Sequence, residues 1–469
     1  MRHGEWSWLI QRARGLERLA AAGDGEGCRA QLLSLSYEFE RLYDEQALAF
    51  LRALDTPAAT QADEGAMRRA QRALCRAVRT VLDLPAGAAA RQVLSPAVVA
   101  LAQSWRPPGE KAAALEEKEQ RLLALGGRED GDFARLTALR GQLAAALGYQ
   151  SLRDWADRET YGRVRADETR RQLAALAPAL RALLERLRGQ YTPFFARRVK
   201  ARPLPPEEAL FRLEGALSGC GELPRLLSYL RVSPYADLSP ARGHYSFTQP
   251  LPGRRDAILR HTAAGDEGDL WVLLHEAGHY AALHPLLHEN PCALWFFEPC
   301  RPDLAEWQAM SVEVMAAKRY RWLYGPLRAR PMRRHLVYTL LHQAAAGLAW
   351  DEFEGLCPDE QTTAGRRERW RAVCAKWGLH GAMTRPDGYL SVDALWRQPG
   401  YGLSYGIGGL SALGLGLRPG GWQKLEQLLA LPLLTPVDEG REKLALPAYE
   451  QTLRLLERGL EKDGDPLAT

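Results

Sequence analysis

The chain contains 469 residues, of which 46% are hydrophobic and 25% are charged, and this is the composition of an ordinary globular protein. Its 62 lysine and arginine residues nearly balance 57 aspartate and glutamate residues, so the formal net charge is only +5, and the arginines alternate with acids. This balance argues against nucleic acid as a partner.

The N-terminal segment MRHGEWSWLIQRAR lacks the apolar run of a secretory signal. No stretch elsewhere approaches 18 consecutive apolar residues, the length that a helix needs to cross a membrane. We therefore expect a cytoplasmic protein that does not associate with membranes.

Helical patterns dominate the chain. Residues 134–148 (ARLTALRGQLAAALG) and 171–190 (RQLAALAPALRALLERLRGQ) are rich in helix formers and place apolar residues three and four apart. Gly148 stands where a helix C-cap is expected, and Ser151 where the next helix would have its N-cap. The sequence therefore predicts a mainly α fold.

Turn-forming segments suggest where this helical chain divides. Proline and glycine gather at RPPGE (106–110), RPLPPEE (202–208) and PARGHYSFTQPLPGRRD (240–256). From these breaks and the helical patterns we expect four regions: an N-terminal helical region (1–110), a second helical region (111–235), a core region (236–330) and a C-terminal helical region (331–469).

One short segment departs from the helical pattern. Ala257, Ile258, Leu259, Arg260 and His261 form an apolar run that suits a β-strand of five residues. The turn GDEGD that follows supplies glycines and an aspartate suited to the N-terminus of a helix. The strand would therefore lie immediately before the next helix.

A glycine-rich tract near the C-terminus, GYGLSYGIGGLSALGLGLRPGG (400–421), also breaks the pattern. Such a density of glycine is typical of a mobile or closely packed loop. We expect this region to form a loop that carries Tyr401 and Tyr405.

The pentapeptide HEAGH (275–279) lies within an apolar helical segment. His275 and His279 are four residues apart, so both imidazoles project from one helix face and can reach a single ion. Glu276 stands beside them, where it can touch a water molecule without ligating the metal. A catalytic zinc ion needs a third protein ligand and an open fourth position.

Two nearby histidines do not complete the set. His284 and His288 fit no long-spaced zinc pattern, because Ala282 and Pro285 stand where that pattern has glycine and histidine. We expect Pro285 and Pro291 to turn this segment away from the metal, so that both histidines lie on the surface or behind the ligands.

Downstream glutamates are the remaining candidates for the third ligand. Glu298 has the spacing of the zinc aminopeptidases, but it lies among prolines in FFEPCRPD. Glu306 lies in the helical pattern LAEWQAMSVEVMAAKRY, and Glu313 follows two turns later on the same face. A ligating carboxylate backed by a second carboxylate that orients an imidazole suits a zinc site. We therefore favour Glu306 as the ligand and Glu313 as its supporting acid, with Glu298 as the competitor.

These residues resemble the oligoendopeptidase F and thimet oligopeptidase family of zinc peptidases. HEAGH followed 27 residues later by Glu306 in EWQAMSVE is similar to the metal motif of that family. Residues 147–176 and 342–354 resemble further family segments, and the resemblance covers roughly residues 120–430.

The resemblance implies a two-lobed helical shell around a deep substrate channel, one zinc ion, and oligopeptide substrates. It also implies that the strand 257–261, beside the zinc helix, presents a free edge with which an extended peptide pairs. Family members carry a tyrosine-rich segment, often with a histidine, that stabilises the tetrahedral intermediate. Tyr401 and Tyr405 match that segment, but no histidine follows His380, so we expect the stabilisation to rest either on tyrosine alone or on His380 folding back toward the site.

The expected activity is therefore zinc-dependent hydrolysis of internal peptide bonds. Glu276 would act as general base, and Tyr401 or Tyr405 would donate a hydrogen bond to the oxyanion. Two alternatives remain: an aminopeptidase that uses Glu298 as a ligand, and a catalytically weak helical shell that only binds peptides.

Overall fold

The structure is a computed structural model that consists mainly of α-helices, with one small β-sheet. It describes residues 3–53, 61–104, 108–163, 165–190, 193–239, 246–289, 301–360, 362–432, 434–461 and 464–467. The predicted mainly α fold is confirmed. Within these ranges, we find no helix with the length and apolar character required to cross a membrane.

The chain divides into two compact units. The first comprises Met1–Gly109, Pro234–Thr262 and Tyr280–Cys300, and the second comprises Glu110–Ser233, Ala263–His279 and Arg301–Thr469. The sequence led us to expect four regions. Two of the expected boundaries, 110/111 and 235/236, lie within two residues of a boundary between the units. The expected boundary at 330/331 lies inside the second unit.

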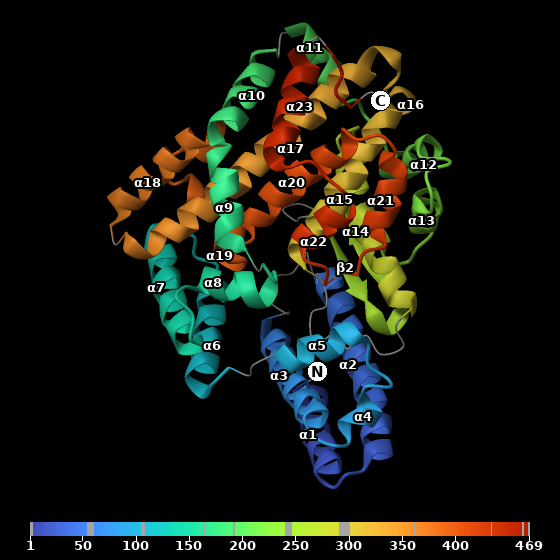
Figure 1. Cartoon of the computed structure of the whole chain (residues 1–469), viewed down its shortest axis with the longest axis vertical. Helices are drawn as coiled ribbons and strands as arrows, with labels where there is room; N and C mark the ends of the chain where they lie inside the picture. The colour runs from blue at the N-terminus through green and yellow to red at the C-terminus, as the bar shows by residue number, and fades with distance from the viewer. Residues whose placement is uncertain are drawn as a thin grey trace. The chain divides into compact units, whose positions relative to one another are not determined.

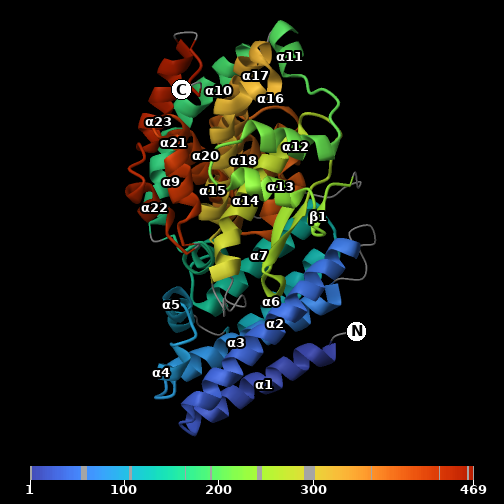
Figure 2. The same cartoon turned by 90° about the vertical axis from the view of Figure 1, so that its right-hand side faces the viewer.

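Three long helices run alongside one another in the first unit (Figure 2): α1 (His3–Ala21), α2 (Gly25–Ala53) and α3 (Gln61–Leu82). Two shorter helices follow, α4 (Gly87–Ala90) and α5 (Pro96–Ser104). The buried face of α1 recurs every three to four residues, as an amphipathic helix requires. Its buried side chains are Trp6, Leu9, Ala13, Leu16 and Ala20.

The sheet also belongs to the first unit. Its strands are β1 (Ala236–Asp237), β2 (Phe247–Leu251) and β3 (Asp256–Arg260), in the order β1-β3-β2. β3 is therefore the central strand. It pairs antiparallel with β2 along its whole length and parallel with β1 at Leu259 and Arg260.

This pairing corrects one expectation. The backbone N–H groups of Leu259 and His261 donate to the carbonyl oxygens of Tyr235 and Asp237 at 3.1 and 2.8 Å. β3 therefore has no free edge there for an added peptide strand, and the expected free edge is wrong. Substrate binding by residues 257–261 remains an untested prediction that has lost its structural reason.

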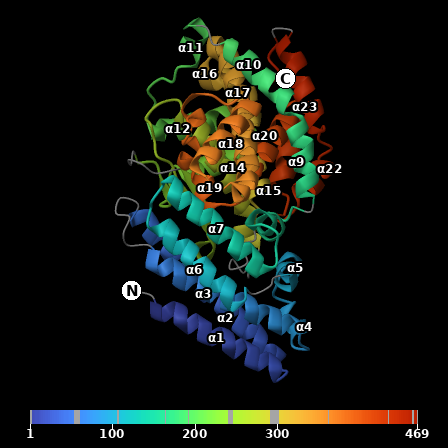
Figure 3. The same cartoon turned by 90° about the vertical axis from the view of Figure 1, so that its left-hand side faces the viewer.

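The second unit begins with two helices that pack side by side (Figure 3), α6 (Glu110–Ala124) and α7 (Asp130–Leu147). Gly148 caps α7 with a left-handed φ of 84°, as its sequence position predicted. Ser151 caps α8 (Leu152–Trp155), and its hydroxyl accepts a hydrogen bond from the backbone N–H of Asp154 at 3.0 Å.

A π-helical turn, η2 (Ala156–Thr160), follows α8. The helical pattern over 171–190 falls in two helices, α9 (Ala166–Ala175) and α10 (Ala177–Gly189), with a turn at Leu176 between them. The remaining helices are α11 (Pro193–Val199), α12 (Pro206–Ala216), α13 (Leu223–Leu230), α14 (Asp269–Glu289), α15 (Pro302–Ala316), α16 (Tyr320–Tyr324), α17 (Pro326–Leu356), α18 (Thr363–Lys376), α19 (Asp393–Arg397), α20 (Gly402–Gly416), α21 (Gly421–Leu429), α22 (Val437–Lys443) and α23 (Tyr449–Glu461).

Helix α20 corrects the expected glycine-rich loop. It lies beside α15 and α17 (Figure 1), and nearly all its residues are buried. A Cβ placed on Gly347 of α17 would lie 2.4 Å from the carbonyl oxygen of Gly402, so glycine is required where these helices touch. The glycines of this tract therefore allow close helix packing rather than loop mobility.

Helix α14 corrects the expected break at Pro285, because the helix continues through this proline to Glu289. Proline costs the helix one hydrogen bond, since it has no N–H to donate. His284 and His288 therefore lie on one face of α14, with their ring centroids 4.4 Å apart.

Candidate metal centre

Two helices of the second unit supply the candidate ligands: residues 269–279 of α14 and helix α15. The carboxylate of Asp269, the first residue of α14, accepts hydrogen bonds from the backbone N–H groups of Ala264 and Gly265 at 2.8 and 2.9 Å. This contact fixes the preceding loop to the start of the helix. On α15, Pro302 occupies the first turn, where its missing N–H costs nothing.

The glycine of HEAGH brings these helices into contact. A Cβ on Gly278 would lie only 2.7 Å from the Cα atom of Ala309 on α15, and 3.3 Å from a methyl group of Val312. No side chain fits between the helices there. Gly278 carries no signal in the sequence beyond its place in the motif, so its packing role emerges only from the structure.

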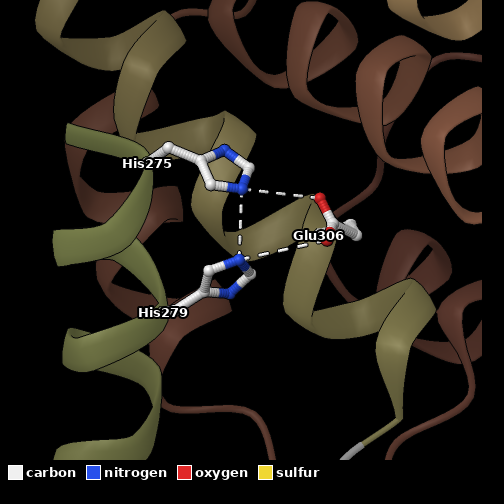
Figure 4. Close-up of side chains that lie close together, drawn as sticks. All are labelled: His275, His279 and Glu306. Atoms are coloured by element: carbon white, nitrogen blue, oxygen red, sulfur yellow. Dashed lines mark hydrogen bonds and ion pairs between the residues drawn. The ribbon is translucent and has the colours of Figure 1, made fainter. Parts of the chain in front are cut away.

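The three predicted ligands meet at this contact (Figure 4). His275 Nε2 lies 3.1 Å from His279 Nε2, and the Glu306 carboxylate oxygens lie 3.6 and 4.0 Å from these two nitrogens. All candidate ligand atoms lie within 4.8 Å of one another, and this is the one group of this kind among the described residues. His284, His288 and Glu313 are not part of it.

The spacing of these atoms suits a single zinc ion. Two ligand atoms at 2.0–2.1 Å from a tetrahedral zinc ion are about 3.3 Å apart, close to the distances observed here. Oε2 of Glu306 is buried and has no hydrogen-bond partner within the described structure, although a buried carboxylate oxygen normally has one. A cation between the three side chains would satisfy it. The residues therefore fit a metal ion.

Glu313, the supporting acid expected from the sequence, contacts one of the candidate ligands. One of its carboxylate oxygens lies 2.8 Å from Nδ1 of His275, on the far side of the ring from Glu306. With Nδ1–H donated to Glu313, Nε2 is the nitrogen that would lose its proton and ligate a metal ion. Glu313 is buried, so this contact is poorly screened by solvent.

Negative charge concentrates around His275. Although burial disfavours the charged imidazole, the hydrogen bond to Glu313 and the charges of Glu306, Glu313 and Glu276 raise the pKa of His275 to about 10. Burial and the neighbouring positive charge of His275 lower the pKa of His279 well below its usual value. Burial raises the pKa of Glu306. A site with this charge distribution favours a bound cation.

The two tyrosines predicted near the metal occupy the start of α20. The hydroxyl group of Tyr401 donates a hydrogen bond to Oε1 of Glu306. The ring of Tyr405 lies edge-on to that of Tyr401, with centroids 5.3 Å apart. Burial and the charges of Glu306 and Glu276 raise the pKa of Tyr405, so its hydroxyl stays protonated.

The remaining candidates of the sequence analysis are Glu298, His380 and residues 257–261. Glu298 falls outside the described residues, so the structure does not place it. His380 bonds through Nε2 to the Tyr338 hydroxyl at 3.0 Å, and its ring lies 5.7 Å from that of His342. These contacts tie His380 to α17. β3, which carries Ala257 to Arg260, belongs to the first unit.

No family model and no curated protein sequence matches this chain. Solved structures, however, share its fold. A Bacillus anthracis protein provisionally named oligoendopeptidase F superposes with a TM-score of 0.77 at 13% identity, covering 97% of this chain and 96% of that one. A second structure with the same provisional name has a TM-score of 0.75 at 16% identity, covering 100% of this chain and 98% of that one.

A PZ peptidase A structure with a bound inhibitor is also similar, with a TM-score of 0.72 at 15% identity over 98% of both chains. At these identities the likeness establishes the fold. The resemblance that the sequence suggested is thus confirmed at that level: the chain has the fold of solved oligoendopeptidase F and PZ peptidase structures.

Proposed function

We propose that this chain is a zinc metallopeptidase that hydrolyses internal bonds of oligopeptides. The convergence of His275, His279 and Glu306 carries the proposal, because these three side chains place their ligand atoms within 4.8 Å of one another. The fold shared with peptidases supports it. A cytoplasmic location and a deep channel remain predictions.

The three ligands would hold one ion, and Glu313 would hold the His275 ring in the tautomer that ligation needs. A zinc ion in such a site polarises a carbonyl group and activates water for attack on it. Nitrogen and carboxylate ligands with an open position suit zinc in particular.

Glu276 would move the proton. It follows His275 directly in α14 and is 5% exposed, and its charge contributes to the raised pKa values of His275 and Tyr405. As general base, the Glu276 carboxylate takes a proton from the attacking water and delivers it to the nitrogen of the leaving amine.

The tyrosines divide into two roles. The Tyr401 hydroxyl donates to Glu306, which favours a role in orienting that ligand. Tyr405 follows one helical turn later. Because the Tyr401 hydroxyl already donates to Glu306, we assign the hydrogen bond to the oxyanion to Tyr405, whose raised pKa keeps its hydroxyl protonated. Loss of such a donor typically costs about 3 kcal/mol of transition-state stabilisation.

Cleavage of defined peptides tests the proposal. Purified protein, loaded with zinc, is incubated with N-blocked and free peptides of about 5 to 20 residues, and mass spectrometry identifies the products. We expect internal cuts in blocked peptides, and we expect these cuts to vanish in Glu276→Gln, which keeps the size of the side chain but removes the base.

Two outcomes would favour the alternatives. Removal of single residues from free N-termini alone would favour the aminopeptidase. Stoichiometric zinc without any cleavage would favour a peptide-binding protein. Separate Glu306→Ala and Glu298→Ala variants identify the third ligand: we expect zinc loss only in the first, and loss only in the second would refute the ligand set.

A further inference from the structure

Arg163 is a buried arginine that none of the site motifs includes. Its side chain is 5% exposed, and all five of its guanidinium N–H groups have acceptors. Nε and Nη2 donate to the two carboxylate oxygens of Asp303 at 2.8 and 2.6 Å. Nη1 donates to Asp157 at 2.6 Å and to the carbonyl oxygen of Gly400 at 2.9 Å, and Nη2 also donates to the hydroxyl of Ser404 at 3.0 Å.

The first of these partners belongs to the helix that carries the third ligand. Asp303 lies in the first turn of α15, three residues before Glu306, so it is almost one helical turn away along the same helix. Asp303 is 3% exposed, and it also accepts a hydrogen bond from Ser404 at 2.6 Å. The bidentate contact with Arg163 therefore fixes the start of α15.

Two of the other partners, Gly400 and Ser404, flank Tyr401 in the sequence. Gly400 precedes it directly, and Ser404 follows three residues later and donates its backbone N–H to the Tyr401 carbonyl oxygen at 2.9 Å. Arg163 therefore donates hydrogen bonds to residues on both sides of Tyr401. The hydroxyl group of this tyrosine bonds to Glu306. One guanidinium group connects the ligand helix to the tyrosine segment.

Arg163 is itself held in place by its neighbours in the sequence. Gly162 has a φ of 60°, a left-handed backbone conformation that strains other residues, and a Cβ on it would displace the guanidinium group of Arg301. Arg301 donates to the carbonyl oxygen of Tyr161 at 3.0 Å. The Tyr161 ring in turn lies beneath the Arg163 guanidinium, 3.9 Å from its central carbon.

We propose that Arg163 is a positioning residue that sets Glu306 and Tyr401 relative to each other and thereby tunes the affinity of the metal centre. The inference rests on the proposed metal site. The planar fork of arginine is essential to this role, because lysine has three donors on one nitrogen atom and cannot bridge Asp303, Gly400 and Ser404 together.

Arg170 on α9 provides a matched control, because it pairs with acids on η2 and α17. This arginine also contacts Asp157, and its remaining carboxylate contacts are with Asp351 and Asp167. Like Arg163, it is largely buried and paired with two buried acids. Among the described residues, these contacts of Arg170 include neither Asp303 nor residues 400–404, so Arg170→Lys disturbs the same ion network without changing a contact to the helices that carry the candidate ligands.

The experiment measures Zn²⁺ affinity of the full-length protein by competition with a chromophoric chelator. We expect Arg163→Lys to bind Zn²⁺ about 10- to 100-fold more weakly, the range found when the outer support of a metal ligand is removed. Ser404→Ala, which removes one of the links, should weaken binding less. Arg170→Lys should leave the affinity within about threefold of the parent, on the same reasoning.

The visible absorption spectrum of the Co²⁺-substituted protein supplies a second readout, independent of activity. A positioning role predicts an altered spectrum in Arg163→Lys and an unaltered one in Arg170→Lys. Circular dichroism and thermal unfolding show whether each variant is folded, and Ser404→Ala preserves the test if Arg163→Lys is not.

Unchanged affinity and spectrum in both Arg163→Lys and Ser404→Ala would overturn the inference. Equal losses of Zn²⁺ affinity in Arg163→Lys and Arg170→Lys would also overturn it, because the ion network would then stabilise the fold in general rather than position the ligands. These readouts are separate from peptide cleavage. A parent protein that binds Zn²⁺ but cuts no peptide would refute the proposed function and leave the role of Arg163 open to the same test.

Discussion

Replacing Gly278 with alanine separates two opposite expectations. Alanine has the higher helix propensity, which on its own would stabilise α14 by about 1 kcal/mol. The structure predicts the reverse, because the new Cβ would lie 2.7 Å from Cα and 3.2 Å from the carbonyl oxygen of Ala309. Non-bonded carbon atoms are most stable at about 3.5–4.0 Å, so α14 and α15 would have to separate by roughly 1 Å.

The magnitude follows from this clash. Overpacking of this kind costs about 1–3 kcal/mol, which exceeds or cancels the gain in helix propensity. We expect Gly278→Ala to lower the free energy of unfolding by about 1 kcal/mol, with the packing cost as the larger contribution. The separation also moves His275 and His279 away from Glu306, so Zn²⁺ affinity should fall roughly tenfold.

Urea unfolding of the metal-free protein and chelator competition for Zn²⁺ measure the two effects. Gly141→Ala is the control, because Gly141 is an exposed glycine inside α7 and a Cβ there would meet nothing within 4 Å. This control should be stabilised by about 1 kcal/mol. If Gly278→Ala were stabilised as much and bound Zn²⁺ as tightly as the parent, the assigned helix contact would be wrong.

Three further predictions concern the acids and tyrosines. Glu313→Gln keeps a hydrogen-bond acceptor for His275 but removes the charge, and Zn²⁺ affinity should fall roughly tenfold in chelator competition; unchanged affinity would contradict its supporting role. In steady-state kinetics Tyr405→Phe should lower kcat about 100-fold with little change in KM, whereas Tyr401→Phe should mainly weaken Zn²⁺ binding; the opposite pattern would exchange their roles. Hydrogen bonds from Arg366, Thr363 and Tyr389 hold the pKa of Asp130 well below its usual range. Asp130 therefore contributes stability above its unfolded pKa of about 4, and this contribution is lost as pH falls further. The difference in urea midpoint between the parent and Asp130→Asn should shrink from pH 7 to pH 3, and a constant difference would rule out this linkage.

The acid network around Asp130 illustrates how far apart in sequence such stabilising partners lie. Asp130 begins α7, whereas Arg366 and Tyr389 come more than 200 residues later. No local pattern in the sequence predicts that these side chains bond to one another, because neither helix propensity nor periodicity carries information across that distance.

Local rules determined much of the metal centre. Two histidines four apart on a helix must share a face, and a glutamate seven residues after another lies two turns along the same face. These periodicities are properties of the α-helix itself, so HEAGH and the pair Glu306 and Glu313 identify the candidate ligands without any tertiary information. The caps at Gly148 and Ser151 were predictable for the same reason.

Tertiary structure decided the rest. The glycine-rich tract predicted a loop, because glycine disfavours an isolated helix. In the structure this tract forms helix α20, because packing against α15 and α17 outweighs that cost. Likewise β3 became the central strand because β1 and β2 cover its edges.

The sequence by itself determined which residues are the candidate metal ligands, since helix geometry fixes their spacing. Only the tertiary structure decided how they are held. Arg163 reaches Asp303 across 140 residues and Ser404 across 241, and Tyr401 reaches Glu306 across 95. Such contacts form because buried charges and hydroxyl groups must find partners once the helices pack, and which partner each one finds depends on that packing.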